Sequence, residues 1–227
     1  IKLNGSGTNV YSITFTNDTI VPCLTGCADN YADIVLTSNA TDIFFLNVSF
    51  NKSRIMFVPR DADNPIETNN LTVQWYLDVN VTNSTDNNPI SNAEVNINNS
   101  FGRNIFSGLT SITGSIATQT VTEFEINGSS FNSTTFFTDD TCVGINNYNV
   151  TCYSPYNISV NKTGYYNNDT SILVNRSRIL NLSMTIIPVA TVNSNLNCTN
   201  ITTPGYIHNL TGNAYSTATC INVLATM

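Results

Sequence analysis

Charged side chains are scarce in this sequence of 227 residues. Asp, Glu, Lys and Arg make up 10% of the chain, whereas they make up about a quarter of an average soluble domain. The 8 Lys and Arg stand against 15 Asp and Glu, which gives a formal net charge of −7. Because phosphate binding depends on clustered Lys and Arg, and the sequence has no basic cluster, nucleic acid is excluded as a partner.

Histidine and long apolar runs are also nearly absent. His208 is the only histidine, and it lies in a stretch rich in Thr and Asn, so no catalytic triad can be assembled around it. The longest apolar run, Met184–Ala190, is broken by Pro188 and is much shorter than the roughly 18 residues that span a bilayer. We therefore expect a protein that is not an enzyme and has no transmembrane segment.

The sequence has few acidic residues, and three groups of them are candidate sites. Glu123 with Glu125, or Asp139 with Asp140, could in principle cleave sugars as a carboxylate pair. Glu123 and Glu125 alternate in a predicted strand and should share its solvent face, whereas Asp139 and Asp140 lie in a predicted turn. The acidic turn at 61–64 lacks the Gly and distant Glu of an EF-hand loop. These patterns indicate solvated structure, with no metal and no cofactor other than covalent glycans.

In contrast, the sequence holds 20 Asn-X-Ser/Thr sequons. Its Asn, Ser and Thr content would give roughly nine in a shuffled chain. An AT-rich genome explains the Asn content but explains the spacing less well. The sequon residues are Asn4, Asn17, Asn39, Asn47, Asn51, Asn70, Asn80, Asn83, Asn98, Asn127, Asn132, Asn149, Asn157, Asn161, Asn168, Asn175, Asn181, Asn197, Asn200 and Asn209. Dense N-glycosylation predicts an extracellular protein at the cell surface.

Six cysteines in a secreted chain predict three disulfides. Proximity in the sequence favours Cys23 with Cys27, Cys142 with Cys152, and Cys198 with Cys220, although fifteen connectivities exist. A zinc site at Cys23 and Cys27 would need two further ligands, and His208 is distant in the sequence. A Lys-to-Asn crosslink would need Lys2, Lys52 or Lys162 as donor, and the sequence does not single one out.

Short apolar or alternating runs between Asn, Gly, Asp and Pro clusters predict an all-β protein. Val, Ile, Thr, Tyr and Phe dominate these runs, and such residues suit a pleated, half-buried surface. The predicted strands are Tyr11–Phe15, Asp33–Thr37, Asp42–Phe50, Leu71–Val81, Ala93–Ile97, Val121–Ile126, Tyr156–Val160, Ser171–Val174 and Ile179–Ile186.

The middle of the chain carries several motifs in a fixed order: Pro89–Val95, Gly102, Phe106–Gly108, Thr110–Gly114 and Pro155–Tyr165. With these motifs, roughly residues 70 to 187 resemble carboxypeptidase-regulatory-like domains. It implies an immunoglobulin-like or transthyretin-like β-sandwich of about seven strands that serves as a structural or interaction module.

The flanking segments at residues 33–55 and 197–224 consist of short apolar strands between Asn-rich turns. Residues 33–55 are similar to the last coils of archaeal surface proteins built on a right-handed parallel β-helix, with Asn47 and Asn51 at the corners, and residues 197–224 are similar to the cap and first coil of such a helix. We therefore predict an all-β protein with three parts: β-helix-like strands at 1–69, an immunoglobulin-like sandwich at 70–190, and a β-helix-like or strand-donating segment at 191–227.

Because the end of a β-helix comes before its beginning, copies of the chain could complete one another. Strand complementation of this kind joins copies head to tail and builds open filaments. The predicted function is thus a structural subunit of an archaeal surface filament, pilus or repeat glycoprotein. A compact monomer whose terminal segments pair with each other is the alternative, and it would serve as an adhesin or carbohydrate-binding module.

A sequon-free segment could form the contact surface in either case. No sequon begins between Asn98 and Asn127, so we expect residues Phe101–Phe124 to form a face without glycans. Under the structural hypothesis this face is a subunit interface, and under the alternative it binds the ligand, where aromatics such as Tyr148, Tyr153, Tyr165 and Tyr166 could stack on sugars.

Overall fold

The computed structural model describes residues 2–4, 10–21, 34–37, 40–52, 55–58, 68–129, 149–192, 200–201, 207–210 and 222–223. Throughout these residues the regular structure is strand, which confirms the predicted all-β class. Within the same residues, no helix is long and apolar enough to cross a membrane.

The N-terminal strands alternate between two parallel sheets, and we call this part the coil stack. One sheet contains β1 (Lys2–Asn4), β3 (Ile34–Thr37) and β5 (Ile55–Val58). The other contains β2 (Val10–Thr16), β4 (Ala40–Leu46) and the first half of β6 (Thr68–Asn83). Each pair of successive strands therefore makes one coil, and among the described strands β1 with β2 form the outermost coil.

Apolar side chains form columns through the coil stack. Ile43 on β4 is in register with Leu71 on β6, and both side chains are 0% exposed. Phe45 is in register with Phe15 on β2, and the two rings meet edge to face with centroids 5.1 Å apart. Such stacking buries apolar surface between coils and holds them in register.

A β-sandwich follows the coil stack. One sheet continues through β6 with β9 (Gln119–Ser129), β10 (Asn149–Cys152) and β13 (Arg178–Met184). The other sheet has the order β12 (Asn168–Ile172), β11 (Tyr156–Asn161), β7 (Glu94–Asn98) and β8 (Asn104–Leu109). Inward residues alternate along the strands of both sheets, which confirms the predicted sandwich; they include Leu77, Val79, Val81, Val95, Ile97, Ile158 and Val160.

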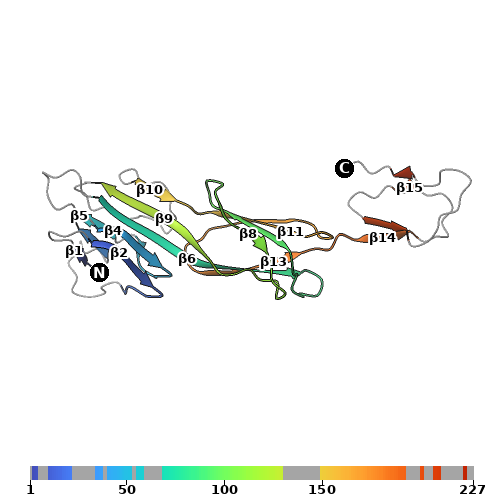
Figure 1. Cartoon of the computed structure of the whole chain (residues 1–227), viewed down its shortest axis with the longest axis horizontal. Coiled ribbons are helices and arrows are strands. Elements are labelled where there is room, and N and C mark those ends of the chain that lie inside the picture. The colour runs from blue at the N-terminus through green and yellow to red at the C-terminus, as the bar shows by residue number, and fades with distance from the viewer. Residues whose placement is uncertain are drawn as a thin grey trace, which may run out of the picture.

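Strand β6 belongs to both parts. One edge pairs with β4 at Leu71–Gln74 and with β13 at Leu77–Asn83, while the other edge pairs with β9 at Thr68–Leu77. Figure 1 shows this strand running from the coil stack into the sandwich without interruption. The boundary expected between residues 69 and 70 thus falls inside one continuous strand.

Two further parallel strand pairs lie in the C-terminal part. β14 (Val189–Val192) pairs with β16 (Ile207–Leu210), and β15 (Asn200–Ile201) pairs with β17 (Asn222–Val223). Successive strands again alternate between two pairs, as they do in the coil stack. Figure 1 shows β14 and β15 at the opposite end of the long axis from β1 and β2.

Candidate functional site

The outer edge of the coil stack is the first candidate site. β1 pairs with β3 and β2 pairs with β4, and among the described strands no other neighbour lies beside β1 or β2. Each of these two strands thus presents one edge whose backbone N–H and C=O groups have no strand partner in the described part. An open edge of this kind is a template for the addition of another strand.

Burial along β2 shows the same incompleteness in its side chains. Ile13 and Phe15 are half-buried and pack on the core, whereas their neighbours one coil further in, Ile43 and Phe45, are fully buried. The hydroxyl side chains of Ser12, Thr14 and Thr16 alternate with them on the exposed face. A further coil stacked on β2 would cover the apolar column in the way that β2 covers β4.

Two sequon asparagines turn corresponding corners of successive coils. Asn17 follows β2 and Asn47 follows β4, and their φ angles are 55° and 54°. Asn tolerates this left-handed backbone region better than most residues. The Asn47 Nδ2 donates to the Asn17 Oδ1 over 2.8 Å. Asn47 therefore occupies a corner as expected, whereas Asn51 has no left-handed backbone.

Ser177 closes the inner end of this asparagine ladder. Its Oγ donates to the Asn47 Oδ1 over 2.7 Å and accepts from the Tyr76 backbone N–H over 3.0 Å. The ladder, which comprises Ser177, Asn47 and Asn17, thus runs from the sandwich to the outermost coil.

The C-terminal strand pairs present matching edges. Among the described strands, β16 pairs with β14 and β17 pairs with β15, so the last strand of each pair has an open side in this part of the chain. Both pairs are parallel. A strand that is added there in parallel orientation would continue the same winding.

The sequon asparagines differ widely in exposure. Exposed side chains are those of Asn17, Asn51, Asn157, Asn161, Asn175 and Asn181, and half-buried ones are those of Asn47, Asn70, Asn80, Asn98 and Asn168. Asn4, Asn127, Asn149, Asn200 and Asn209 lie in strands, and Asn39, Asn132 and Asn197 lie outside the described residues.

The sequon asparagines Asn80, Asn83 and Asn181 also make side-chain hydrogen bonds within the fold. Asn83 is 8% exposed, and its Oδ1 accepts from the Thr85 backbone N–H over 3.0 Å. The Asn80 Nδ2 donates to the Asn181 Oδ1 over 3.0 Å, across the parallel pair of β6 and β13. A glycan at Asn83 would require this side chain to leave its buried position.

One predicted cysteine can be placed. Cys152, the last residue of β10, forms a disulfide. Cys23, Cys27, Cys142, Cys198 and Cys220 lie outside the described residues, so the pairing of Cys142 with Cys152 stays a prediction.

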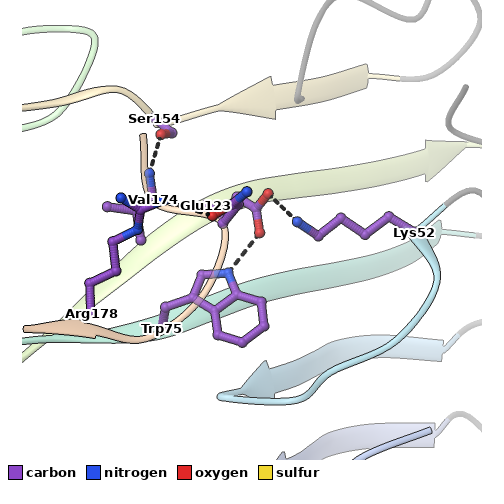
Figure 2. Close-up of polar contacts among 7 residues, drawn as sticks. Lys52, Trp75, Glu123, Ser154, Val174 and Arg178 are labelled. Carbon is purple, nitrogen blue, oxygen red and sulfur yellow. Dashed lines mark hydrogen bonds and ion pairs between the residues drawn. The ribbon is translucent and has the colours of Figure 1, made fainter. Parts of the chain in front are cut away.

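A buried charge cluster joins the coil stack to the sandwich, and the sequence did not reveal it (Figure 2). The Lys52 Nζ lies 2.5 Å from the Glu123 Oε1, and the Trp75 Nε1 donates to the Glu123 Oε2 over 2.6 Å. Lys52 is 7% exposed and Glu123 is 2% exposed. The Lys52 Nζ also lies 5.9 Å from the centroid of the Trp75 ring, within the range of a cation–π contact.

The expectation that Glu123 and Glu125 share a solvent face is wrong. The register between β6 and β9 shifts here, because Val73 pairs with Phe124 while Gln74 pairs with Thr122. Glu123 is the extra residue of this β-bulge and points inward beside Phe124, which is 1% exposed. Glu125 instead accepts from the Tyr153 hydroxyl over 3.1 Å.

The remaining candidate groups do not converge on one site. Asp139, Asp140 and the acidic turn at 61–64 lie outside the described residues, and no group of three or more metal-binding side chains occurs within them. The Lys162 Nζ donates to the Asn92 carbonyl oxygen over 3.2 Å. The Lys52 ammonium contacts the Glu123 carboxylate.

The sequon-free segment presents three large apolar side chains. Phe101, Leu109 and Ile112 are 66%, 61% and 87% exposed, whereas Phe106 is half-buried and Phe124 is buried. Phe101 meets Tyr153 edge to face with ring centroids 5.8 Å apart. Burial raises the pKa of Tyr153, and the hydrogen bond to Glu125 raises it further.

Comparison with known proteins assigns no family. No protein-family model matches the chain, and no curated protein matches it. A solved structure described as "The Bacillus anthracis TIE protein" is similar at a TM-score of 0.29 and 12% identity, over 67% of this chain and 23% of that one. The chain thus spans less than a quarter of that protein's length, and a likeness of this size carries no functional argument.

Proposed function

We propose that the protein is a structural subunit of an extracellular, N-glycosylated surface filament or repeat glycoprotein. The observation that carries this proposal is the pair of open coil edges, β1 and β2 at one end of the long axis and the parallel pairs of β14 to β17 at the other. Copies joined head to tail complete each other's winding. The disulfide of Cys152 and the sequon density support an oxidising, extracellular location.

Chain order supports this direction of assembly. In both end segments, successive strands alternate between two parallel sheets or pairs. β16 and β17 are the last strands of their segment, and β1 and β2 are the first of theirs. Stacking β16 and β17 of one copy on β1 and β2 of the next therefore continues the coil without reversing its strands. This contact is heterologous, so it extends without limit unless rotation closes a ring.

Electron microscopy of the native secreted material, without denaturation, tests the proposal. We expect continuous filaments with an axial repeat of one subunit. Discrete particles of a single glycosylated chain would overturn it and would favour the monomeric adhesin or carbohydrate-binding module, whose ligand face would then be the exposed Phe101, Leu109 and Ile112.

A substitution on the outermost coil separates assembly from folding. Ile13→Asp places a charge in the apolar column at its open end, where β2 contributes only half-buried side chains. We expect filaments to be lost while the monomer keeps its protease resistance. Thr14→Asp is the matched control, because Thr14 is exposed on the other face of the same strand. Filaments formed equally by both variants would contradict stacking on β2.

A further inference from the structure

Asn17 belongs to the asparagine ladder and is also the first residue of a sequon. Asn17-Asp18-Thr19 is the sequon of the outermost coil, and Asn47-Val48-Ser49 is the corresponding sequon one coil further in. Thr16 and Leu46, which precede the two asparagines, are paired in register. Thr19 and Ser49 form a parallel bridge, so the two sequons lie side by side over their whole length.

An asparagine inside the ladder makes hydrogen bonds through both the Oδ1 and the Nδ2 of its carboxamide. The Asn47 Oδ1 accepts from Ser177 on the inner side, and the Asn47 Nδ2 donates to Asn17 on the outer side. Asn17 uses only its Oδ1, which faces Asn47. Within the described part of the chain its Nδ2 has no hydrogen-bond partner, and the residue is exposed. Because oxygen and nitrogen lie on opposite sides of the carboxamide, the Nδ2 faces outward, toward the position of the next coil.

The same nitrogen is the atom that N-glycosylation modifies. The anomeric carbon of an activated glycosyl phosphate donor forms a bond to Nδ2, its bond to the phosphate oxygen breaks, and the nitrogen loses one hydrogen. Adjacent coils lie only about 4.8 Å apart. A sugar ring on the Asn17 Nδ2 would therefore occupy the space in which the next coil must place its backbone.

We propose that Asn17 decides whether the coil stack grows, because glycosylation of its Nδ2 and stacking of the next coil exclude each other. The Nδ2 of unmodified Asn17 can donate the next hydrogen bond of the ladder to a second copy of the chain. Glycosylated Asn17 caps the edge and ends the filament. This inference rests on the proposed head-to-tail assembly.

Glycopeptide mapping of two fractions tests the inference. Native material is separated into filaments and unassembled chains, and occupancy is measured at Asn17 and at Asn161, an exposed sequon residue at the end of β11. We expect Asn17 to be at least tenfold less occupied in filaments than in unassembled chains, with Asn161 equal in both. Equal occupancy of Asn17 in both fractions, including none in either, would overturn the inference and leave head-to-tail assembly intact.

Two variants with matched chemistry give an independent readout. Thr19→Ala removes the sequon but keeps the Asn17 side chain, since Thr19 pairs with Ser49 through its backbone. We expect its filaments to be at least twofold longer on average in micrographs. Thr163→Ala, which removes the Asn161 sequon, should leave their length unchanged. Unchanged length in both variants would contradict capping, and the absence of filaments from every preparation would overturn the proposed function as well.

Discussion

A carboxylate buried at Glu123 is stable only because its partners are in place. Both of its oxygens are engaged, one by the Lys52 ammonium and one by the Trp75 indole N–H. Moving such a charge from water into the protein interior costs free energy. Removing one partner of the pair is strongly destabilising, because the other charge is then buried alone. Lys52 follows a coil corner while Glu123 lies in β9, so this ion pair joins the coil stack to the sandwich.

Removing only the cation should therefore lower the free energy of unfolding more than removing both charges does. We expect Lys52→Met to lower the free energy of unfolding by about 3–5 kcal/mol, because it leaves the Glu123 carboxylate buried without its counter-charge. The double variant Lys52→Met/Glu123→Gln should recover most of that loss, since the glutamine oxygen can still accept from Trp75.

Chemical denaturation of the parent chain, Lys52→Met, Glu123→Gln and the double variant measures the effect. Lys162→Met is the control, because the Lys162 contact to the Asn92 carbonyl is exposed, and it should cost less than about 0.5 kcal/mol. A double variant no more stable than Lys52→Met alone would show that the buried pair is not the cause.

The inward turn of Glu123 had a signal in the sequence. Apolar residues of this strand change phase, from Val121 at an odd position to Phe124 and Ile126 at even ones. A change of phase is what a β-bulge produces. Its partner Lys52 could not be predicted, because the pair is separated by 71 positions and its contact depends on the tertiary arrangement. The asparagine corner at Asn47 was predictable, but its hydrogen bond to Asn17 was not.

At the scale of elements, strands with strict alternation were predicted best. Val73–Val81 places every second residue in the core, and its strand is found as β6. β8 was missed because its residues alternate poorly between exposed and half-buried positions at the edge of a sheet. β5 and β10, of four residues each, were also missed because such short runs carry little periodicity.

The two sheets of the sandwich are linked by a tyrosine whose ionisation should matter. Tyr156 on β11 is 1% exposed, and its hydroxyl donates to the Thr122 carbonyl oxygen on β9 over 2.7 Å. Burial raises the pKa of Tyr156 above its ordinary value of 10.0. The folded state then holds the phenol proton more tightly than the unfolded state, so the stability from this group is complete below pH 10 and decreases as the pH rises further.

Unfolding by urea at pH 8 and pH 11 checks this expectation. Tyr156→Phe should be about 1 kcal/mol less stable at pH 8, because it lacks the hydrogen bond to Thr122. Between the two pH values it should lose less stability than the parent chain. An equal loss in the variant and the parent chain would exclude Tyr156 as the cause of the pH dependence.

For the whole molecule, the order of segments was more informative than any single motif. Strand runs at both ends suggested coils whose order is reversed, and the structure has parallel pairs in both places. Their positions at opposite ends of the long axis could not be predicted, because they depend on the direction in which β6 and β13 leave the sandwich (Figure 1).

The sequon-free segment yields a prediction about contacts between whole molecules. Ile112 is 87% exposed, so Ile112→Asp should change the stability of the single chain by less than about 0.5 kcal/mol. We expect it to weaken assembly, because this face is the expected subunit interface; pelleting and micrographs of the assembled material measure the effect. Ile179→Asp is the control, because Ile179 is 67% exposed on β13 near the sequon residue Asn181. Assembly that is unchanged in the Ile112 variant would remove this face from consideration.

The continuity of β6 has a mechanical consequence for any assembly of copies. Tension applied along the long axis enters one 16-residue strand that is paired on both edges, first within the coil stack and then within the sandwich. Pulling on such a strand shears many hydrogen bonds at once instead of opening them one after another. The passage from coils to sandwich is therefore a place where the molecule resists extension, not a hinge at which it bends.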